Sequence, residues 1–253
     1  MSTLRNVDSR EWELRCDLAA AYRLLARFGM DDLIYTHLSV RLPGEEHRFL
    51  LNPYGLMFDE ITASSLVEVD PDGHAIEKEE ESKINNAGFT IHSAVHMARD
   101  DAQCVMHTHT TAGMAVAAQE QGLLPLNQMS MEFYGRTSYH DYEGVALDLD
   151  ERPRLQKDLG KKNIMLLHNH GTLTVGETCA AAFLRMYYLE RACTMQVRTR
   201  MLGGAAQDYP VAQDVIDKNA RLIAGDGFSK LAQHLVWPAL LRKLDRVDPS
   251  FRN

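Results

Sequence analysis

Two short apolar runs in this chain each end in histidine, and this pattern limits how the chain can fold. Residues 104–106 lead into His107-Thr108-His109, and residues 164–167 lead to His170 and Gly171. In an extended strand, residues i and i+2 point to the same face, so His107 and His109 can present their rings side by side. We therefore expect a sheet in which two strands end close together.

Three imidazoles that converge in this way predict an open metal site. His170 lies at the C-terminal end of its expected strand, where open α/β sheets place their ligand sites. Three protein ligands leave a coordination position for water or substrate. The alternative is that the histidines only end two strands and hydrogen-bond to nearby loops. That alternative stays open for His107 and His109 alone, and the addition of His170 favours a metal.

Composition narrows the class of protein. The 253 residues are 45% hydrophobic and 25% charged, which fits a globular protein with a substantial core. No apolar run is long enough to span a bilayer, and residues 1–10 do not resemble a signal peptide, so we expect no membrane partner. The net charge of −8 argues against sequence-independent binding to nucleic acid. Four cysteines without Cys-x-x-Cys spacing suggest reduced thiols, as in the cytoplasm. Together these features leave a cytoplasmic enzyme or binding protein with a small-molecule partner.

Hydrophobic periodicity predicts one mixed α/β domain over residues 1–253. Its core covers about residues 10–200, and a helical extension follows over about residues 205–253. Asp8 or Ser9 can cap the first helix, which Gly29 ends. Residues after Pro125 are typical of loops and strands. The expected helices are 9–28, 84–99, 110–118, 155–160 and 177–200, with weaker patterns at 212–223 and 231–244; the expected strands are 38–42, 48–51, 66–69, 74–76, 104–109 and 164–167.

Several ordered segments resemble the class II aldolase/adducin family, particularly its adducin-like branch, which is related to fuculose-phosphate aldolase and ribulose-phosphate epimerase. The segments are residues 32–41, 87–94, 101–109, 166–171 and 188–192. The resemblance implies a three-layer α/β/α sandwich with a central, mostly antiparallel sheet. It also implies a homo-oligomer, commonly a ring-like tetramer, with active sites at subunit interfaces. In such relatives three histidines hold a divalent metal, and the matching positions here are His107, His109 and His170. We expect Zn²⁺ first, with Mn²⁺, Fe²⁺ or Co²⁺ as alternatives.

The chain also departs from the sugar-phosphate aldolases of this family. Their proton-transfer glutamate corresponds to Gly88, nineteen residues before His107, and glycine can do no acid–base chemistry. Their phosphate-binding elements are also changed. One element corresponds here to Thr36-His37-Leu38-Ser39, and a second to Asn52-Pro53-Tyr54-Gly55. Residues 86–87 take the place of the paired serines. We expect His37, Ser39 and Tyr54 to bind an unphosphorylated substrate.

The residues predict a metal-dependent lyase that cleaves a C–C bond, by aldol cleavage or decarboxylation, of a small hydroxy-carbonyl or carboxylate substrate. The metal would act as a Lewis acid that stabilises the enolate formed when the bond breaks. Proton transfer is assigned to Glu132, Tyr134 and His140, because these groups can titrate or lie where relatives contribute a tyrosine across the interface. Each could instead close hydrogen bonds at an interface, which is favoured for Tyr139 and Tyr142.

Two other functions fit the same residues. A three-histidine site can hold Fe²⁺ and support a non-heme oxygenase, although no carboxylate ligand can be assigned from the sequence. An adducin-like binding or scaffold protein without catalysis is the third interpretation. Structural zinc sites are normally closed by a fourth protein ligand, and the sequence offers no obvious one, which favours chemistry over scaffolding.

Overall fold

The structure, a computed structural model, describes residues 7–44, 47–77, 84–145, 148–203, 208–223 and 227–253. Within these residues a seven-stranded sheet has the order β3-β2-β1-β4-β7-β6-β5. Among its neighbouring pairs β5 and β6 are parallel and the others are antiparallel, which confirms the mostly antiparallel sheet. The strands are β1 (His37–Arg41), β2 (Phe49–Leu51), β3 (Val67–Val69), β4 (Cys104–Thr108), β5 (Thr137–His140), β6 (Ile164–Leu167) and β7 (Gly171–Gly176).

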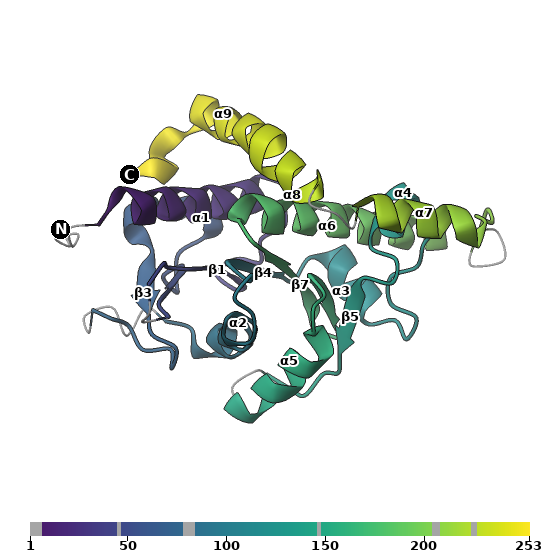
Figure 1. Cartoon of the computed structure of the whole chain (residues 1–253), viewed down its shortest axis with the longest axis horizontal. Helices are drawn as coiled ribbons and strands as arrows, with labels where there is room; N and C mark the ends of the chain where they lie inside the picture. The colour runs from purple at the N-terminus through teal and green to yellow at the C-terminus, as the bar shows by residue number, and fades with distance from the viewer. Residues whose placement is uncertain (1–6, 45–46, 78–83, 146–147, 204–207, 224–226) are drawn as a thin grey trace.

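Helices cover both faces of the sheet, so the predicted α/β fold with three layers is confirmed (Figure 1). The helices α1 and α6 run along one face, and α2 and α5 lie against the other. The C-terminal α9 packs outside α1. The helices are α1 (Ser9–Arg27), α2 (Asn86–Ala98), α3 (Thr111–Ala117), α4 (Gln128–Glu132), α5 (Arg152–Leu159), α6 (Cys179–Met201), α7 (Gln213–Ile223), α8 (Gly227–Leu231) and α9 (Trp237–Val247).

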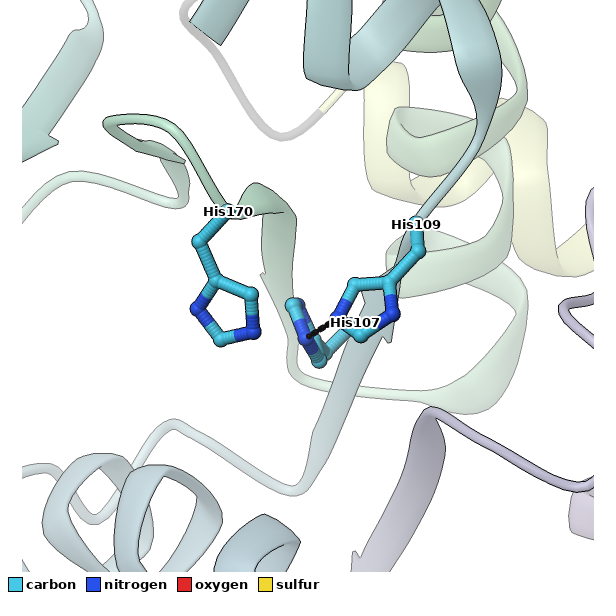
Figure 2. A group of neighbouring side chains, drawn as sticks. All are labelled: His107, His109 and His170. Atoms are coloured by element: carbon cyan, nitrogen blue, oxygen red, sulfur yellow. Dashed lines mark hydrogen bonds between the residues drawn. The ribbon is translucent and has the colours of Figure 1, made fainter. Parts of the chain in front are cut away.

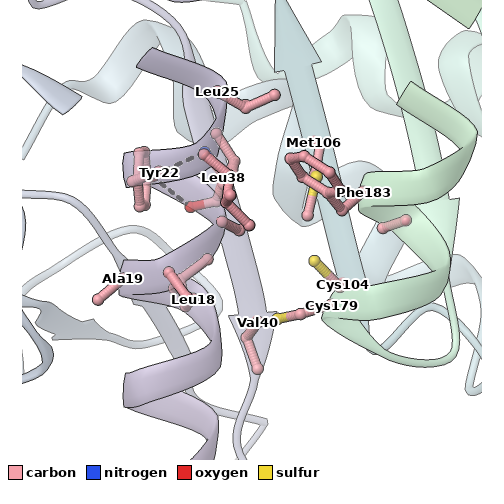
Figure 3. Close-up of a cluster of buried hydrophobic side chains, with 14 of the residues drawn as sticks. Leu18, Ala19, Tyr22, Leu25, Leu38, Val40, Cys104, Met106, Cys179 and Phe183 are labelled. Atoms are coloured by element: carbon pink, nitrogen blue, oxygen red, sulfur yellow. Dashed lines mark hydrogen bonds between the residues drawn. The ribbon is translucent and has the colours of Figure 1, made fainter. Parts of the chain in front are cut away.

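The core between α1, the sheet and α6 follows from the predicted apolar pattern. The Asp8 side chain caps α1 by accepting from the Glu11 amide, and Gly29 ends the helix region with a φ of +66°. Figure 3 shows α1 facing β1 and β4 across buried side chains such as Leu38 and Met106. The buried Tyr22 hydroxyl accepts from the Leu38 amide at 2.7 Å, which ties α1 to the sheet.

Alternation along β4 sends its side chains to opposite faces of the sheet. Cys104 and Met106 belong to the core under α1 and α6, whereas Val105 belongs to the core under α2 and α5. By the period of two, His107 lies on the same face as Val105. The strand therefore points its terminal histidine toward the α2 side, while its apolar residues anchor it in both cores.

The C-terminal helices share the α1 core. Trp237, Leu244 and Phe251 are buried in it, and the indole of Trp237 donates to Asp17 at 2.9 Å. The division into one domain over residues 1–253 stays a prediction. In the part of the chain that the structure describes, no helix combines the length and apolar character needed to cross a membrane.

Three segments differ from the sequence-based expectation. Residues 74–76, expected as a strand, contribute only an isolated bridge between Ala75 and Val69. Residues 128–132 form the short helix α4 rather than a loop or strand, because the Asn127 side chain caps it by accepting from the Ser130 amide. Residues 171–176, for which no element was predicted, form β7 inside the sheet, between β4 and β6. Its polar threonines are buried: Thr174 donates to the Ala182 carbonyl at 3.0 Å, so their polarity does not indicate an exposed segment.

Candidate metal centre

Sheet topology brings the three predicted metal histidines together. Because β4 and β6 are both antiparallel to β7, which lies between them, they run in the same direction and end at the same edge of the sheet. His107 lies in β4 and His109 just after it, while His170 lies in the turn from β6 to β7. In Figure 2 the three rings face one another, and one nitrogen from each lies within 4.8 Å of the others. The predicted grouping is present.

A close backbone approach explains the glycine that follows His170. A Cβ on Gly171 would lie 2.5 Å from the Thr108 carbonyl oxygen and 3.1 Å from ring atoms of both His107 and His109. Only glycine leaves these atoms in place. The preceding Asn169 has a φ of +55°, a conformation that asparagine tolerates, and this turns His170 back toward β4. The His170-Gly171 pair is thus part of the geometry of the site.

Hydrogen bonds fix the orientation of two of the rings. The Nδ1 of His107 lies 3.0 Å from the Thr172 carbonyl oxygen, and the Nδ1 of His109 lies 3.1 Å from the Asp32 carboxylate. Both partners only accept, so each Nδ1 carries the proton and each Nε2 presents a lone pair. The two Nε2 atoms face each other at 2.9 Å. Two lone pairs repel at this distance unless a cation or a shared proton lies between them.

Burial keeps the imidazoles of His107 and His170 neutral. The pKa of His107 is held well below its usual range by burial, reinforced by His170 and His109, and burial lowers the pKa of His170 to about 4. Neutral imidazole is the form that binds metal, so no proton has to be displaced from these two rings near neutral pH. The donor set fits a divalent cation of the Zn²⁺, Mn²⁺, Fe²⁺ or Co²⁺ type.

Asp32 is a site residue that sequence reasoning missed. It lies 77 positions before His109 in the chain, and its carboxylate holds the His109 ring from outside the ligand set. Such carboxylate–histidine pairs orient metal ligands and raise their basicity. The only available signal was its place in the segment 32–41, which matched the family without suggesting this role.

Removing the carboxylate charge at Asp32 should weaken metal binding. We expect Asp32→Asn to lower the affinity for Zn²⁺ by about 10–100-fold, because the amide holds the His109 ring less firmly and no longer polarises it. Competition with a chromophoric chelator measures the change. The neighbouring Asp31→Asn is the matched control and should bind like the wild type; an equal loss in both variants would contradict the role of Asp32.

His37 and Ser39 lie on β1, next to the metal histidines but inside the protein. His37 pairs with His107 across the β1–β4 ladder, and burial lowers its pKa to about 4. The Ser39 hydroxyl is fully buried and lies 2.6 Å from Nδ1 of His92 and 2.7 Å from Nε2 of His96. A substrate-binding role for either residue stays a prediction, and Ser39 already has two partners within the chain.

The other predicted residues differ in burial and in their contacts. Tyr54 and Tyr134 are exposed. Burial raises the pKa of Glu132, with Arg136 opposing the shift. His140 is buried, with Nδ1 2.7 Å from the Asp158 carboxylate and Nε2 3.3 Å from that of Glu151, so both of its nitrogens are engaged. The assignment of Glu132, Tyr134 and His140 to proton transfer stays a prediction, as does that of Tyr54 to substrate binding.

Tyr142 lies beside His170, one of the three histidines. Its ring centroid lies 6.3 Å from that of His170, and the side chain is exposed. The sequence favoured an interface role for this tyrosine. That role stays a prediction, and the position beside His170 also supplies a phenol, a group that can donate a hydrogen bond or exchange a proton.

Comparison with known proteins agrees with this geometry. The family description "Class II Aldolase and Adducin N-terminal domain" matches residues 16–197. A crystal structure of an aldolase II superfamily protein from Pseudomonas syringae superimposes with a TM-score of 0.92 at 46% identity, covering 100% of both chains. An L-fuculose 1-phosphate aldolase from Glaciozyma antarctica superimposes with a TM-score of 0.84 at 29% identity, covering 100% of this chain and 97% of the other. Rat alpha-adducin is 44% identical over 250 residues, which cover 95% of this chain and 34% of the adducin.

These matches confirm the resemblance seen in the sequence, and they extend over both the sheet and the turn that carries His170. The chain belongs to the class II aldolase and adducin family.

Proposed function

We propose that this chain is a metal-dependent lyase that cleaves a C–C bond, by aldol cleavage or decarboxylation, of a small unphosphorylated hydroxy-carbonyl or carboxylate substrate. One observation carries the proposal: His107 and His109 are oriented with their Nε2 atoms facing each other, and His170 closes the group. The three would hold a divalent cation, with Zn²⁺ as our first choice. Once bound, the cation would supply Lewis acidity to a substrate oxygen on which negative charge develops.

Proton transfer must come from a group other than Gly88, and the chain offers several. We assign it to Glu132, Tyr134 and His140. Burial raises the pKa of Glu132, which makes its carboxyl group a better base than an ordinary glutamate. The two carboxylates that bracket His140 would hold its ring in place rather than leave it free to reorient. Tyr142, beside His170, is a further proton donor for this assignment.

We choose an unphosphorylated substrate because His37 and Tyr54 occupy segments where the sugar-phosphate aldolases have small phosphate-binding residues. His37 is buried and lies beside His107, where its bulk fills space and its low pKa keeps it uncharged. A neutral imidazole gives little electrostatic stabilisation to a phosphate dianion. We propose that His37, Ser39 and Tyr54 favour a hydroxyl or carboxylate group instead.

We further propose that the protein acts in the cytoplasm as a homotetramer with active sites at its interfaces. All four cysteines are buried free thiols, as is usual in a reducing compartment. Tyr134 and Tyr142 are exposed side chains that a neighbouring subunit could cover. The similarity to alpha-adducin favours one alternative, a binding protein without catalysis, which the following experiment distinguishes.

The test is turnover by the metal-loaded protein. Untagged protein loaded with Zn²⁺, Mn²⁺, Fe²⁺ or Co²⁺ is incubated with a panel of small hydroxy-acids and hydroxy-carbonyl compounds, and cleavage products are followed by mass spectrometry. We expect metal-dependent cleavage that disappears in the double variant His107→Ala/His109→Ala. Oxygen consumption with Fe²⁺ would support the oxygenase instead. Stoichiometric metal without turnover of any panel compound would favour the adducin-like protein.

A further inference from the structure

A second cavity lies at the edge of the sheet opposite the metal histidines. Its volume is about 150 Å³, and it opens where β5 and β6 begin. Ile164, the first residue of β6, lines the cavity, whereas Leu167, the last, leads to His170. The length of the strand therefore separates the cavity from the three histidines. The three metal histidines of the proposed lyase lie at the other edge, whereas its proposed residues Glu132 and Tyr134 flank Phe133, which lines this cavity.

The lining of this cavity is basic although the chain as a whole is acidic. Arg136, Lys161, Lys162 and Arg185 line it, and among the residues that the structure describes no aspartate or glutamate does. The whole chain, by contrast, has 35 acidic and 27 basic residues. Like charges around one small space repel each other, and the ion pair of Arg185 with Glu177 offsets only part of this repulsion. The balance of charge therefore favours a negatively charged occupant.

Arg136 has unused hydrogen-bonding capacity. Its guanidinium makes one long contact, 3.5 Å to the Glu132 carbonyl oxygen. Burial and the nearby Arg185 lower its pKa, and the attraction of Glu132 offsets only part of this shift. A partly buried arginine normally donates hydrogen bonds from its several N–H groups to a carboxylate or phosphate. Here most of those donors remain available at the cavity wall.

Arg185 is held in a fixed orientation beside Arg136. It is buried, donates to the Val175 carbonyl at 2.7 Å, and forms an ion pair with Glu177 at 2.9 Å. Its guanidinium also lies 5.6 Å from the Phe228 ring centre. Since Glu177 neutralises much of its charge, the positive potential of the cavity depends mainly on Arg136 and the two lysines.

Asn163 adds a neutral donor to the same wall. Its side-chain oxygen accepts from Arg99 at 2.7 Å, which leaves the amide N–H₂ group to donate. Lys162 also lies at the cavity, with its ammonium group 2.8 Å from the Thr137 carbonyl. An ammonium has three donors, so this contact leaves it able to bind an anion as well.

We propose that this basic cavity binds the phosphate group of a small molecule, or inorganic phosphate itself, at a site separate from the metal centre. The arrangement joins a planar arginine fork, which matches phosphate geometry, to lysine point charges and an amide donor. The volume limits the occupant to one such group. The inference does not depend on the proposed lyase activity, because no metal histidine takes part.

Titration calorimetry with inorganic phosphate tests the site. Protein in a buffer without phosphate or sulfate should bind one phosphate per chain with an affinity that falls as salt is added. Arg136→Gln should weaken binding by about tenfold or more, because it removes charge-assisted hydrogen bonds. Lys161→Gln, an exposed position whose change should not disturb folding, should weaken it in the same direction. Arg246→Gln removes the same charge at an exposed position of α9, outside the cavity, and this variant should bind phosphate like the wild type.

A variant without the metal histidines tests whether phosphate binding is independent of the metal site. In His107→Ala/His109→Ala, phosphate binding and its sensitivity to Arg136→Gln should be unchanged. The proposal is overturned if phosphate shows no saturable binding. It is also overturned if binding disappears in the histidine variant, or if Arg136→Gln and Lys161→Gln both bind phosphate as tightly as Arg246→Gln. Failure of the lyase assay would leave these outcomes unaffected.

Discussion

Replacing His170 by alanine should reduce metal affinity by more than the roughly 10–100-fold expected when a supporting partner of a ligand is lost. His107 and His109 come from one strand end, so the β6–β7 turn supplies the third nitrogen of the group. With two imidazoles left, a divalent cation would keep most of its coordination positions filled by water, and dissociation becomes easier. Competition titration with a chromophoric chelator measures the loss for Zn²⁺.

His168 offers a matched control for this experiment. It lies two residues before His170, and its Nδ1 is engaged by the Ala117 carbonyl at 2.8 Å, while its ring stacks on Tyr139. His168→Ala deletes the same side chain from the same turn region and should keep nearly the wild-type metal affinity. Equal weakening in the two variants would mean that the turn, rather than the His170 imidazole, determines binding.

Acidification should destabilise the fold through the buried histidine His96. Burial lowers its pKa from an ordinary value of 6.5 to about 3. Above pH 6.5 both the folded and unfolded states keep this imidazole neutral. Below pH 6.5 the unfolded chain takes up a proton that the folded chain excludes, so the free energy of unfolding falls by about 1.4 kcal/mol per pH unit. The effect of this residue reaches about 2 kcal/mol at pH 5 and ends near pH 3.

Burial excludes the proton from His96 and outweighs the hydrogen bond to the Ala102 carbonyl, which favours the charged ring. Its Nδ1 donates to the Ala102 carbonyl at 2.7 Å, its Nε2 lies 2.7 Å from the Ser39 hydroxyl, and its ring stacks on Phe49. Arg41 is the nearby positive charge that opposes protonation further. Because the neutral ring accepts from Ser39, the Ser39 oxygen is left to accept from Nδ1 of His92.

Urea unfolding between pH 7 and 5 isolates this contribution. His96→Gln removes the titrating group, so its free energy of unfolding should fall less steeply with acid than that of the wild type, by about 1.4 kcal/mol per pH unit. His234→Gln, at an exposed position, should keep the wild-type slope. If the slopes of the wild type and His96→Gln are equal, the buried imidazole does not control acid stability.

The sequence revealed those parts of the site that are encoded locally. His107 and His109 lie two residues apart on a recognisable strand, and His170 precedes a glycine at the end of another, so both patterns could be seen in short windows. The helices with strong caps and apolar stripes, such as α1 and α6, were also predicted closely. An apolar pattern at helical spacing over about twenty residues was sufficient to locate both helices, although each is buried on more than one side over part of its length.

The remaining features depend on long-range pairing that a single sequence does not contain. Asp32 reaches His109 only because the chain folds back between them, and the Thr172 carbonyl serves His107 only once β7 pairs with β4. The basic cavity likewise draws its lining from segments far apart in the chain, such as Arg136 and Arg185. The strand β7 was missed because its buried threonines resemble exposed residues in composition.

The metal content of untagged protein, measured by mass spectrometry beside His107→Ala/His109→Ala, tests the central claim most directly. We predict close to one divalent metal per chain in the wild type and almost none in the double variant, with both proteins folded by circular dichroism. A wild type that holds no metal even after incubation with Zn²⁺, Mn²⁺, Fe²⁺ and Co²⁺, or a double variant that keeps its full metal content, would contradict the assignment of these three histidines.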